Sequence, residues 1–381
     1  MKILHCCLSQ FYIDNYSYQE NILPRVNKQM GHEVKIIAST ETYLDNRNLE
    51  YVEPSRYYTE DGIEIVRLPY RKALPHKFMR KIRSYKGVTK EIEKFSPDVI
   101  LHHGVPAYEL LTFARYKMKN PNIRLYVDSH EDFHNSARNF LSREILHRRF
   151  YKPIVQKALP YIDKVLCTSL EVFDFLEQLY EIPRSIMEFY PLGGIVVDGI
   201  EHQQRREKIR LDLGLGEDDV LFVHSGKMNR KKRTEDLLRA FSAVKSKKLR
   251  LILIGNLDGE IEKNVKALIS QDDRVSFIGW KTGNELIDYL CACDMYLQPG
   301  TQSATLQNAI CTGCPVMLYP YESHRPYLKD NGFFVQTVED MIDVFLKIES
   351  NPSIIEDMRV ASYKVAYDIL DYKKLASRLY R

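Results

Sequence analysis

The sequence lacks any apolar run of the roughly 20 residues that a membrane-spanning helix needs. It also lacks a strong excess of charge of one sign. Its 55 Lys and Arg are nearly balanced by 51 Asp and Glu, and the formal net charge of +4 gives no indication of nucleic-acid binding. No Asp-x-Asp triplet occurs, so neither a carboxylate-bound divalent metal ion nor another cofactor is expected. The chain becomes polar at Ser9 and Gln10, too early for a signal peptide, and we expect a soluble cytoplasmic protein.

The seven cysteines are an odd number and lie partly in apolar runs, which indicates reduced thiols rather than a disulfide framework. Two close pairs, Cys291 with Cys293 and Cys311 with Cys314, invite comparison with zinc sites. They fall at a predicted helix end and turn, so small buried thiols are the favoured interpretation.

Short β-branched runs alternate with amphipathic stretches over most of the 381 residues. In the first half, strands are predicted at residues 2–8, 33–38, 63–68, 99–102, 124–127 and 164–168, and helices at 18–30, 77–94, 108–117, 143–159 and 170–180. After a polar segment at 198–208, strands are predicted at 220–224, 249–254, 275–278, 295–297 and 315–318, and helices at 234–246, 260–270, 285–292 and 304–312.

This alternation predicts an α/β protein with two Rossmann-like, doubly wound parallel sheets. The predicted domains are residues 1–195 and 196–355, followed by a helix at 356–381 that returns to the first domain. Ligands of such sheets bind beyond the carboxyl ends of the strands, so we expect the site in a cleft between the two domains.

The best-defined site signal is a predicted strand that runs into Gly226 and then into five cations within residues 227–233. A glycine lets the backbone approach a ligand closely. Clustered cations repel one another unless an anion or water lies among them. The loop would suit a diphosphate next to Lys227 and Lys232, and a solvated basic turn is the alternative.

A second signal covers residues 298–316, which read as strand, turn, short helix, glycine and strand. Thr301 or Ser303 would cap the helix, whose free N–H groups would favour an anion. An ordinary capped helix explains the same residues.

Several short motifs, taken in order, resemble the GT-B glycosyltransferases, specifically the family 4-like group. They are Gly-His-Glu-Val at residues 31–34, the strand at 61–69, Asp-Ser-His-Glu at 128–131, Gly226 with Lys227 and Lys232, the Val-x-Phe-x-Gly pattern at 275–279, and the segment 309–316.

The resemblance implies transfer of a sugar from a nucleotide-sugar donor, first of all a UDP-sugar, to a glycan or lipid-linked acceptor in surface polysaccharide biosynthesis. The donor residues it implies are Gly226, Lys227, Lys232, Thr301, Gln302 and Ser303 at the diphosphate, and Asn308, Gly279 and Trp280 at the ribose and base. His130 would lie near the donor sugar, and Glu131 or Asp132 would act as a base if the reaction inverts configuration. Cationic side chains would stabilise the departing diphosphate in place of a metal ion.

The sequence departs from this family where two glutamates are expected eight residues apart. Gly300 and Asn308 stand there instead. Asn308 can hydrogen-bond a ribose hydroxyl, whereas the donor sugar and the stereochemical course stay open. Two rival functions also stay open, a non-hydrolysing nucleotide-sugar epimerase and a non-catalytic subunit that binds a nucleotide or glycan.

Two further stretches are candidates for contact with the acceptor and with a membrane. The polar and aromatic residues 10–17 include Tyr12, which would suit stacking on an acceptor sugar, although a packed loop explains them equally well. His103 ends another strand and would line the same cleft, and a purely structural role explains it equally well. Residues 67–90 hold nine Lys or Arg and no acid. Within them, residues 77–90 predict a basic amphipathic helix that could rest on the inner face of a membrane, although packing on the protein's own sheet is favoured.

Overall fold

The computed structural model describes residues 1–16, 18–43, 49–303 and 305–380. The chain forms two compact units, Met1–Pro191 together with Tyr372–Arg381, and Leu192–Asp371. The boundary therefore precedes the predicted one at residue 195, and residues 356–371 belong to the second unit rather than to a returning helix. Ser17, Ala304 and Arg381, which end or begin three predicted segments, lie outside the described residues.

The first unit is built on a sheet in which the strands follow the order β10-β9-β8-β7-β1-β2-β6-β5. All neighbours are parallel except β5 and β6. The strands of this unit are β1 (Lys2–Cys7), β2 (Glu33–Ser39), β3 (Glu41–Tyr43), β4 (Leu49–Tyr51), β5 (Ser55–Tyr58), β6 (Glu64–Leu68), β7 (Val99–His103), β8 (Arg124–Ser129), β9 (Lys164–Cys167) and β10 (Met187–Phe189). The winding reverses between β1 and β7, so a crevice is expected at their carboxyl ends.

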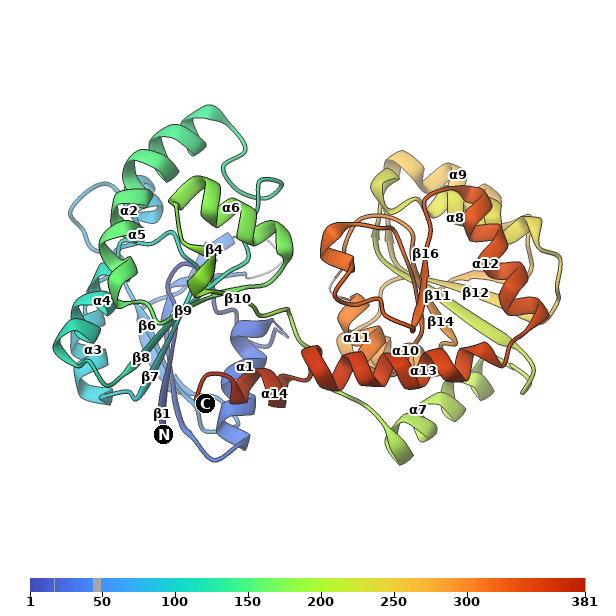
Figure 1. The fold of residues 1–381 in the computed structure, drawn as a ribbon, viewed down its shortest axis with the longest axis horizontal. Helices are drawn as coiled ribbons and strands as arrows, with labels where there is room; N and C mark the ends of the chain where they lie inside the picture. Colours follow the sequence, from blue (N-terminus) through green and yellow to red (C-terminus); the bar gives the residue numbers. More distant parts are fainter. Residues whose placement is uncertain (17, 44–48, 304, 381) are drawn as a thin grey trace. The chain divides into compact units, whose positions relative to one another are not determined.

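Helices cover both faces of this sheet (Figure 1). They are α1 (Gln19–Gln29), α2 (His76–Ile82), α3 (Val88–Phe95), α4 (Leu110–Lys119), the π-helical η2 (Leu141–Tyr151), α5 (Lys152–Ala158), α6 (Leu170–Tyr180), α14 (Tyr372–Ser377) and the short 3-10 turns η3 (Leu159–Tyr161) and η4 (Arg184–Ile186). Because both faces are covered, a central strand such as β1 is an almost uninterrupted buried run.

The helix predicted at residues 77–94 is wrong, because it is broken between α2 and α3. Arg83 and Gly87 have left-handed backbone, with φ of 55° and 97°. Between them Tyr85 is fully buried, and its hydroxyl donates to the carbonyl oxygen of Leu8 at 2.9 Å. Placing this side chain in the core requires the chain to leave the helical path.

The second unit holds one parallel sheet in the order β13-β12-β11-β14-β15-β16, which is 3-2-1-4-5-6 counted within the unit. Its strands are β11 (Val220–Met228), β12 (Leu249–Leu257), β13 (Val275–Phe277), β14 (Met295–Gln298), β15 (Val316–Leu318) and β16 (Gly332–Phe334). Its helices are α7 (Gly199–Asp212), η5 (Arg230–Lys232), α8 (Thr234–Ala243), α9 (Gly259–Ile269), α10 (Gly283–Ala292), α11 (Thr305–Cys311), η6 (Glu322–His324), α12 (Val338–Ser350), α13 (Ile354–Val365) and the π-helical η7 (Ala366–Leu370). The predicted α/β class with two Rossmann-like domains is confirmed.

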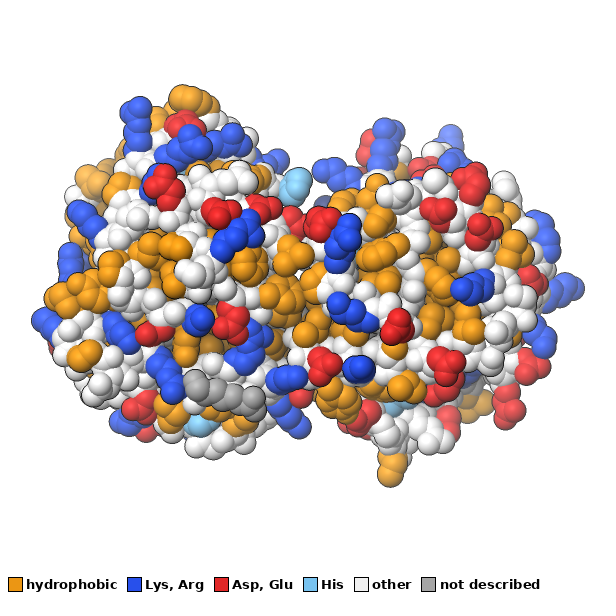
Figure 2. Space-filling model, viewed as in Figure 1, with side chains coloured by type: hydrophobic (Ala, Val, Ile, Leu, Met, Phe, Trp, Pro, Cys, Tyr) orange, Lys and Arg blue, Asp and Glu red, His pale blue; other side chains and the backbone are white. Residues whose placement is uncertain are grey.

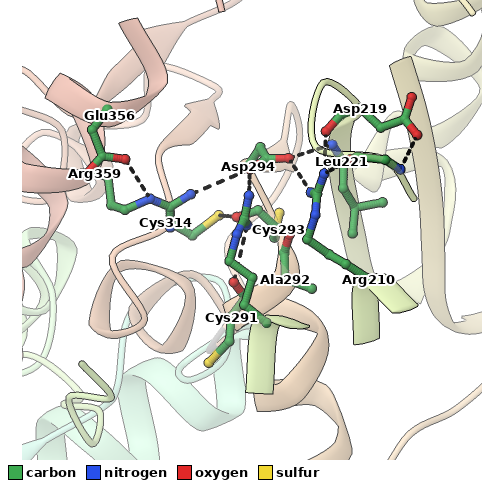
Figure 3. A network of polar contacts seen from close by, with 12 residues as sticks. Arg210, Asp219, Leu221, Cys291, Ala292, Cys293, Asp294, Cys314, Glu356 and Arg359 are labelled. Carbon is green, nitrogen blue, oxygen red and sulfur yellow. Dashed lines mark hydrogen bonds and ion pairs between the residues drawn. The ribbon is translucent and has the colours of Figure 1, made fainter. Parts of the chain in front are cut away.

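Asp294, just before β14, ties four elements of the second unit together (Figure 3). Its carboxylate lies 2.6 Å from Arg206 Nη2, 3.1 Å from Arg210 Nη1 and 3.5 Å from Arg359 Nη2. It also accepts from the backbone N–H of Leu221 at 2.8 Å. The polar segment at residues 198–208 is therefore a helix, α7, fixed to the sheet by charge rather than by an apolar stripe.

The last residues of the chain pack on the first unit, where α14 lies beside α1 (Figure 1). Leu375 and Leu379 join Ile3, Leu23 and Val26 in one apolar cluster. None of the helices in the described ranges is long and apolar enough to cross a membrane.

Candidate functional site

A chain of buried polar side chains runs through the first unit near the point where its winding reverses. Asn27 Nδ2 lies 3.0 Å from His5 Nε2, His5 Nδ1 lies 3.1 Å from His103 Nε2, and His103 Nδ1 lies 2.6 Å from Asp128 Oδ2. His5, His103 and Asp128 are fully buried. Parallel pairing of β7 with β8 sets His103 opposite Asp128. The register of the two paired strands therefore brings these polar side chains within hydrogen-bonding distance.

The donors in this chain have one consistent arrangement. The Asn27 amide nitrogen can only donate, so His5 accepts at Nε2 and donates from Nδ1. His103 then accepts at Nε2 and donates from Nδ1 to Asp128. Burial, and next the neighbouring His103, lower the pKa of His5 well below its usual value.

His130 is the cation that faces the Asp128 carboxylate. Its Nε2 lies 3.9 Å from Asp128 Oδ2, and its side chain keeps 22% of its exposure. Burial alone would lower the pKa of His130, but Asp128 outweighs burial and raises it to about 9. Burial would raise the pKa of Asp128, yet His103 and His130 hold it well below its usual value. This row of buried polar side chains therefore places the His130 imidazolium at the edge of the sheet where the parallel strands end.

Glu131 and Asp132, which follow His130, have different environments. Asp132 Oδ1 accepts from the N–H groups of His134 and Asn135 at 2.7 and 2.9 Å, so it shapes the loop. Glu131 Oε2 is buried and has no hydrogen-bond partner within the described residues. Burial raises the pKa of Glu131 to about 7, against the charges of Arg83 and His130. Of the two candidate bases, Glu131 is the one with a buried carboxylate oxygen, Oε2, that is not used by the loop.

The structure does not support acceptor contacts for Tyr12 and His103. Tyr12 is 5% exposed, and its ring lies under the Arg67 guanidinium, 5.6 Å from centroid to Cζ. Its carbonyl oxygen accepts from Arg67 Nη2 at 3.3 Å. His103 is fully buried and hydrogen-bonded to Asp128 through Nδ1. Packing therefore makes Tyr12 structural and leaves His103 to act through Asp128.

In the second unit, Lys232 is a buried cation without a carboxylate partner in the described chain. It is 7% exposed, and its Nζ donates to the carbonyl oxygens of Thr301 and Gln302 at 2.6 and 2.7 Å. Burial lowers the pKa of Lys232 to about 8. Burying an unpaired charge is costly. An anion bound here would offset that cost.

Four of the predicted diphosphate residues lie around this lysine, namely Gly226, Thr301, Gln302 and Ser303. Gly226 has a φ of 127°, and an added Cβ there would lie 3.8 Å from Ser303 Oγ and 3.9 Å from Lys232 Cε. Ser303 Oγ accepts from the N–H of Thr305 at 3.3 Å, at the start of α11. Strand β11 extends beyond the predicted end to Met228, so Gly226 and Lys227 lie in the strand, with Lys227 exposed.

The predicted ribose and base residues lie on two sides of this strand end. Gly255 pairs with Gly226 in the sheet, and its N–H donates to the carbonyl oxygen of Gly279 at 2.8 Å. Trp280 follows with 57% of its surface exposed. Asn308 lies on α11, with its Oδ1 3.3 Å from an added Cβ at Gly194.

Two family models match the chain, Glycosyltransferase Family 4 over residues 25–193 and Glycosyl transferases group 1 over residues 205–365. The chain belongs to the GT-B glycosyltransferases. The resemblance seen in the sequence is confirmed.

Solved structures show the same fold at low sequence identity. Sucrose-phosphate synthase from Thermosynechococcus elongatus is 15% identical with a TM-score of 0.64, covering 100% of this chain and 97% of that chain. HepE from Anabaena in complex with UDP is 13% identical with a TM-score of 0.65, covering 100% and 98%. WaaG, a glycosyltransferase involved in lipopolysaccharide biosynthesis, is 14% identical with a TM-score of 0.61, covering 99% and 98%. No curated protein sequence gives a significant match.

Gly300, where the resemblance places the first of the two glutamates, has no room for a side chain. A Cβ at Gly300 would lie 2.2 Å from the carbonyl oxygen of Lys231 and 2.7 Å from the backbone carbon of Lys232. The N–H of Thr301 donates to the same Lys231 oxygen at 3.0 Å. The turn after β14 is thus packed directly on the basic loop, and only glycine fits.

Sequence reasoning overlooked the residues that line a cavity in the first unit of the glycosyltransferase. Arg80, Arg83 and Arg138 meet there with Glu131. Glu131 was predicted, Arg80 and Arg83 lie in the basic stretch 67–90 that was interpreted as a helix face, and no local pattern marked Arg138. Among the described residues, no group of three or more His, Cys, Asp or Glu is placed to hold a metal ion. All seven cysteines are free and buried.

Proposed function

We propose that this protein transfers a sugar from a UDP-sugar to a glycan or lipid-linked acceptor in surface polysaccharide biosynthesis, in the cytoplasm at the inner face of the membrane. The observation that carries the donor assignment is Lys232, a buried ammonium without a counter-ion in the described chain, between Gly226 and the turn at Thr301. The complexes of HepE with UDP and with UDP-glucose support a nucleotide-sugar donor.

Lys232 and Lys227 would neutralise the diphosphate as it departs. The charge of the buried Lys232, fixed in a water-poor site before the reaction, is more effective than charge recruited from solvent. We propose that these side chains replace a metal ion. The exposed Trp280 and the carbonyl group of Gly279 would contact the base, and Asn308 a ribose hydroxyl.

His130 would orient or share charge with the donor sugar. The imidazolium is held by Asp128 and can donate to a sugar hydroxyl or to the leaving oxygen. If the reaction inverts configuration, Glu131 would take the proton of the acceptor hydroxyl, since a pKa of about 7 suits a base near neutral pH.

Only part of the stretch predicted to contact a membrane, residues 77–90, is available for it, because Met79 and Tyr85 are buried. Phe78 of α2 is 58% exposed. The segment entering η2 exposes Phe140 and Leu141 at 75% and 66%. Basic side chains lie around exposed apolar ones on this part of the first unit (Figure 2). Such a surface suits an anionic membrane, and the lipopolysaccharide role of WaaG supports a lipid-linked acceptor.

The membrane contact is tested by co-sedimentation with vesicles that contain phosphatidylglycerol. We expect the wild-type protein to sediment with them and the Phe140→Ser/Leu141→Ser variant to stay largely in the supernatant. Vesicles of phosphatidylcholine alone serve as the control. Equal sedimentation of both proteins would refute the assignment of this surface.

The donor is tested by thermal unfolding with UDP-, GDP-, ADP- and CMP-sugars. A ligand at about 100 times its dissociation constant adds about 2.7 kcal/mol of stability, and we expect this only with a UDP-sugar. Slow hydrolysis of that donor should occur in EDTA and be lost in Lys232→Ala. Binding without turnover would favour the non-catalytic subunit, and a second sugar nucleotide formed without acceptor would favour the epimerase.

A further inference from the structure

A cavity of about 430 Å³ lies within the first unit, between the end of α2, the loop after β8 and the start of η2. This volume is in the range of small-molecule sites. Four cations line it, Arg80, Lys81, Arg83 and Arg138. The sugar-donor residues of the second unit do not contribute to it.

The four cations have no ion pair with a carboxylate in the described part of the chain. Arg83 Nη1 donates to Ser9 Oγ at 2.5 Å and to the carbonyl oxygen of Pro106 at 3.0 Å. The left-handed backbone at Arg83, uncommon for a side chain of this size, aims it inward. The arginine is thus fixed before any ligand arrives. Like charges gathered this closely favour an anion between them.

Two carboxylates share the cavity wall but do not cancel this charge. Glu131 Oε2 and Glu41 Oε1 have no hydrogen-bond partner among the described residues. Burial raises the pKa of Glu41 above its usual value and that of Glu131 to about 7. Glu131 is therefore partly protonated near neutral pH, burial also favours the neutral form of Glu41, and the four cations outnumber the two carboxylates.

We propose that this cavity binds the acceptor through a phosphate group held by Arg80, Arg83 and Arg138. Guanidinium groups bind such anions with two parallel hydrogen bonds. Glu131, on the same wall, then meets a hydroxyl of the acceptor. This inference rests on the proposed function, because it takes the first unit as the acceptor-binding one.

The test titrates glucose 1-phosphate, and glucose as its neutral match, into the full-length protein saturated with UDP. Saturation keeps the Lys232 site occupied, so that the added phosphate reports on the cavity. The variants are Arg80→Gln/Arg138→Gln and the control Arg149→Gln, which removes an exposed cation of η2 outside the cavity. A parallel titration uses water-soluble dihexanoyl phosphatidic acid, because the same phosphate can come on a free sugar or on a lipid.

We expect the double variant to lose at least tenfold in affinity for one of the two phosphates, and the control to lose less than twofold. The titrant whose affinity falls, the sugar phosphate or the lipid phosphate, shows which kind of molecule carries the anion. Unchanged affinity for both phosphates in the double variant, or equal binding of glucose, would overturn the proposal.

The double variant should bind UDP as the wild type does, which shows that it is folded. If the wild type failed to bind UDP, the proposal of a UDP-sugar donor would be refuted. The same phosphate titrations without nucleotide would still measure binding to the cavity. Failure of the donor proposal and failure of the cavity proposal can therefore be told apart.

Discussion

His103 Nδ1 lies 2.6 Å from Asp128 Oδ2, with both side chains fully buried, at the end of two paired parallel strands. His103 also lies 3.1 Å from His5 through its other ring nitrogen, so it joins His5 to Asp128. The carboxylate also accepts from the N–H of Gly104 at 2.9 Å. His103 and His130 hold the pKa of Asp128 well below its usual value, and the ionised carboxylate in turn raises the pKa of His130.

Asp128→Asn should therefore deprotonate His130 at neutral pH. Without the carboxylate, burial dominates, and the pKa of His130 should fall from about 9 to below its usual value of 6.5. The imidazole signal of His130, followed by NMR against pH, measures this directly. Titration of His130 at the same pH in both proteins would contradict the assignment.

The same pair predicts a pH window for stability. The pKa of Asp128 is lower in the folded protein than in the unfolded chain, so the ionised carboxylate stabilises the fold at pH values above the unfolded pKa. This stabilisation is lost as the pH falls through the folded pKa. The raised pKa of His130 gives stability that is complete below 6.5 and lost as the pH rises through about 9. Asp128→Asn should cost about 3 kcal/mol of unfolding free energy at pH 5.5. In urea titrations the cost should shrink at pH 9.5, and a constant cost would argue against the pair.

Gly300→Ala should destabilise the second unit, because the added methyl overlaps the Lys231 carbonyl oxygen. We expect a loss of about 1–3 kcal/mol in urea unfolding, with weaker UDP binding because the loop that carries Lys232 must move. Gly259→Ala, where an added Cβ meets nothing within 4 Å, is the matched control. Gly300→Glu should not raise activity. A gain would mean that the missing carboxylate, rather than the steric contact, matters most.

Asp294→Ala should be among the most damaging single changes in the second unit. It would leave three arginines facing a buried space without their carboxylate (Figure 3). Removing one partner of a buried ion pair costs about 3–5 kcal/mol. Asp218→Ala removes an exposed pair with Lys248 and should cost less than about 1 kcal/mol. Similar losses in the two variants, measured by urea unfolding, would mean that the Asp294 network contributes little.

The sequence allowed the parallel sheets to be predicted because buried strands carry continuous apolar runs. β2 and α6 begin at the predicted residues. Helix α7 was missed because only His202 and Ile209 on it are buried, and distant Asp294 holds its arginines. No local pattern shows such a partner.

Some features of the candidate site could likewise be predicted from the sequence, and others could not. The glycine and lysine motifs could be read locally, and so could the strand end before His130. The pairing of His5 with His103 and the burial of Lys232 under Thr301 depend on residues far apart in the chain. The role of Arg83 depends on the burial of Tyr85, which breaks the helix. These features follow from tertiary packing, which one sequence does not display.

The central claim is that Lys232 holds the diphosphate of the donor. Calorimetric titration of UDP into the wild type, Lys232→Met and the exposed-neighbour control Lys231→Met tests it most directly. We expect Lys232→Met to lose at least tenfold in affinity and to unfold no more easily than the wild type without UDP, because an unpaired buried charge has been removed. Lys231→Met should bind within twofold of the wild type. Equal UDP affinity in Lys232→Met and the wild type would contradict the account.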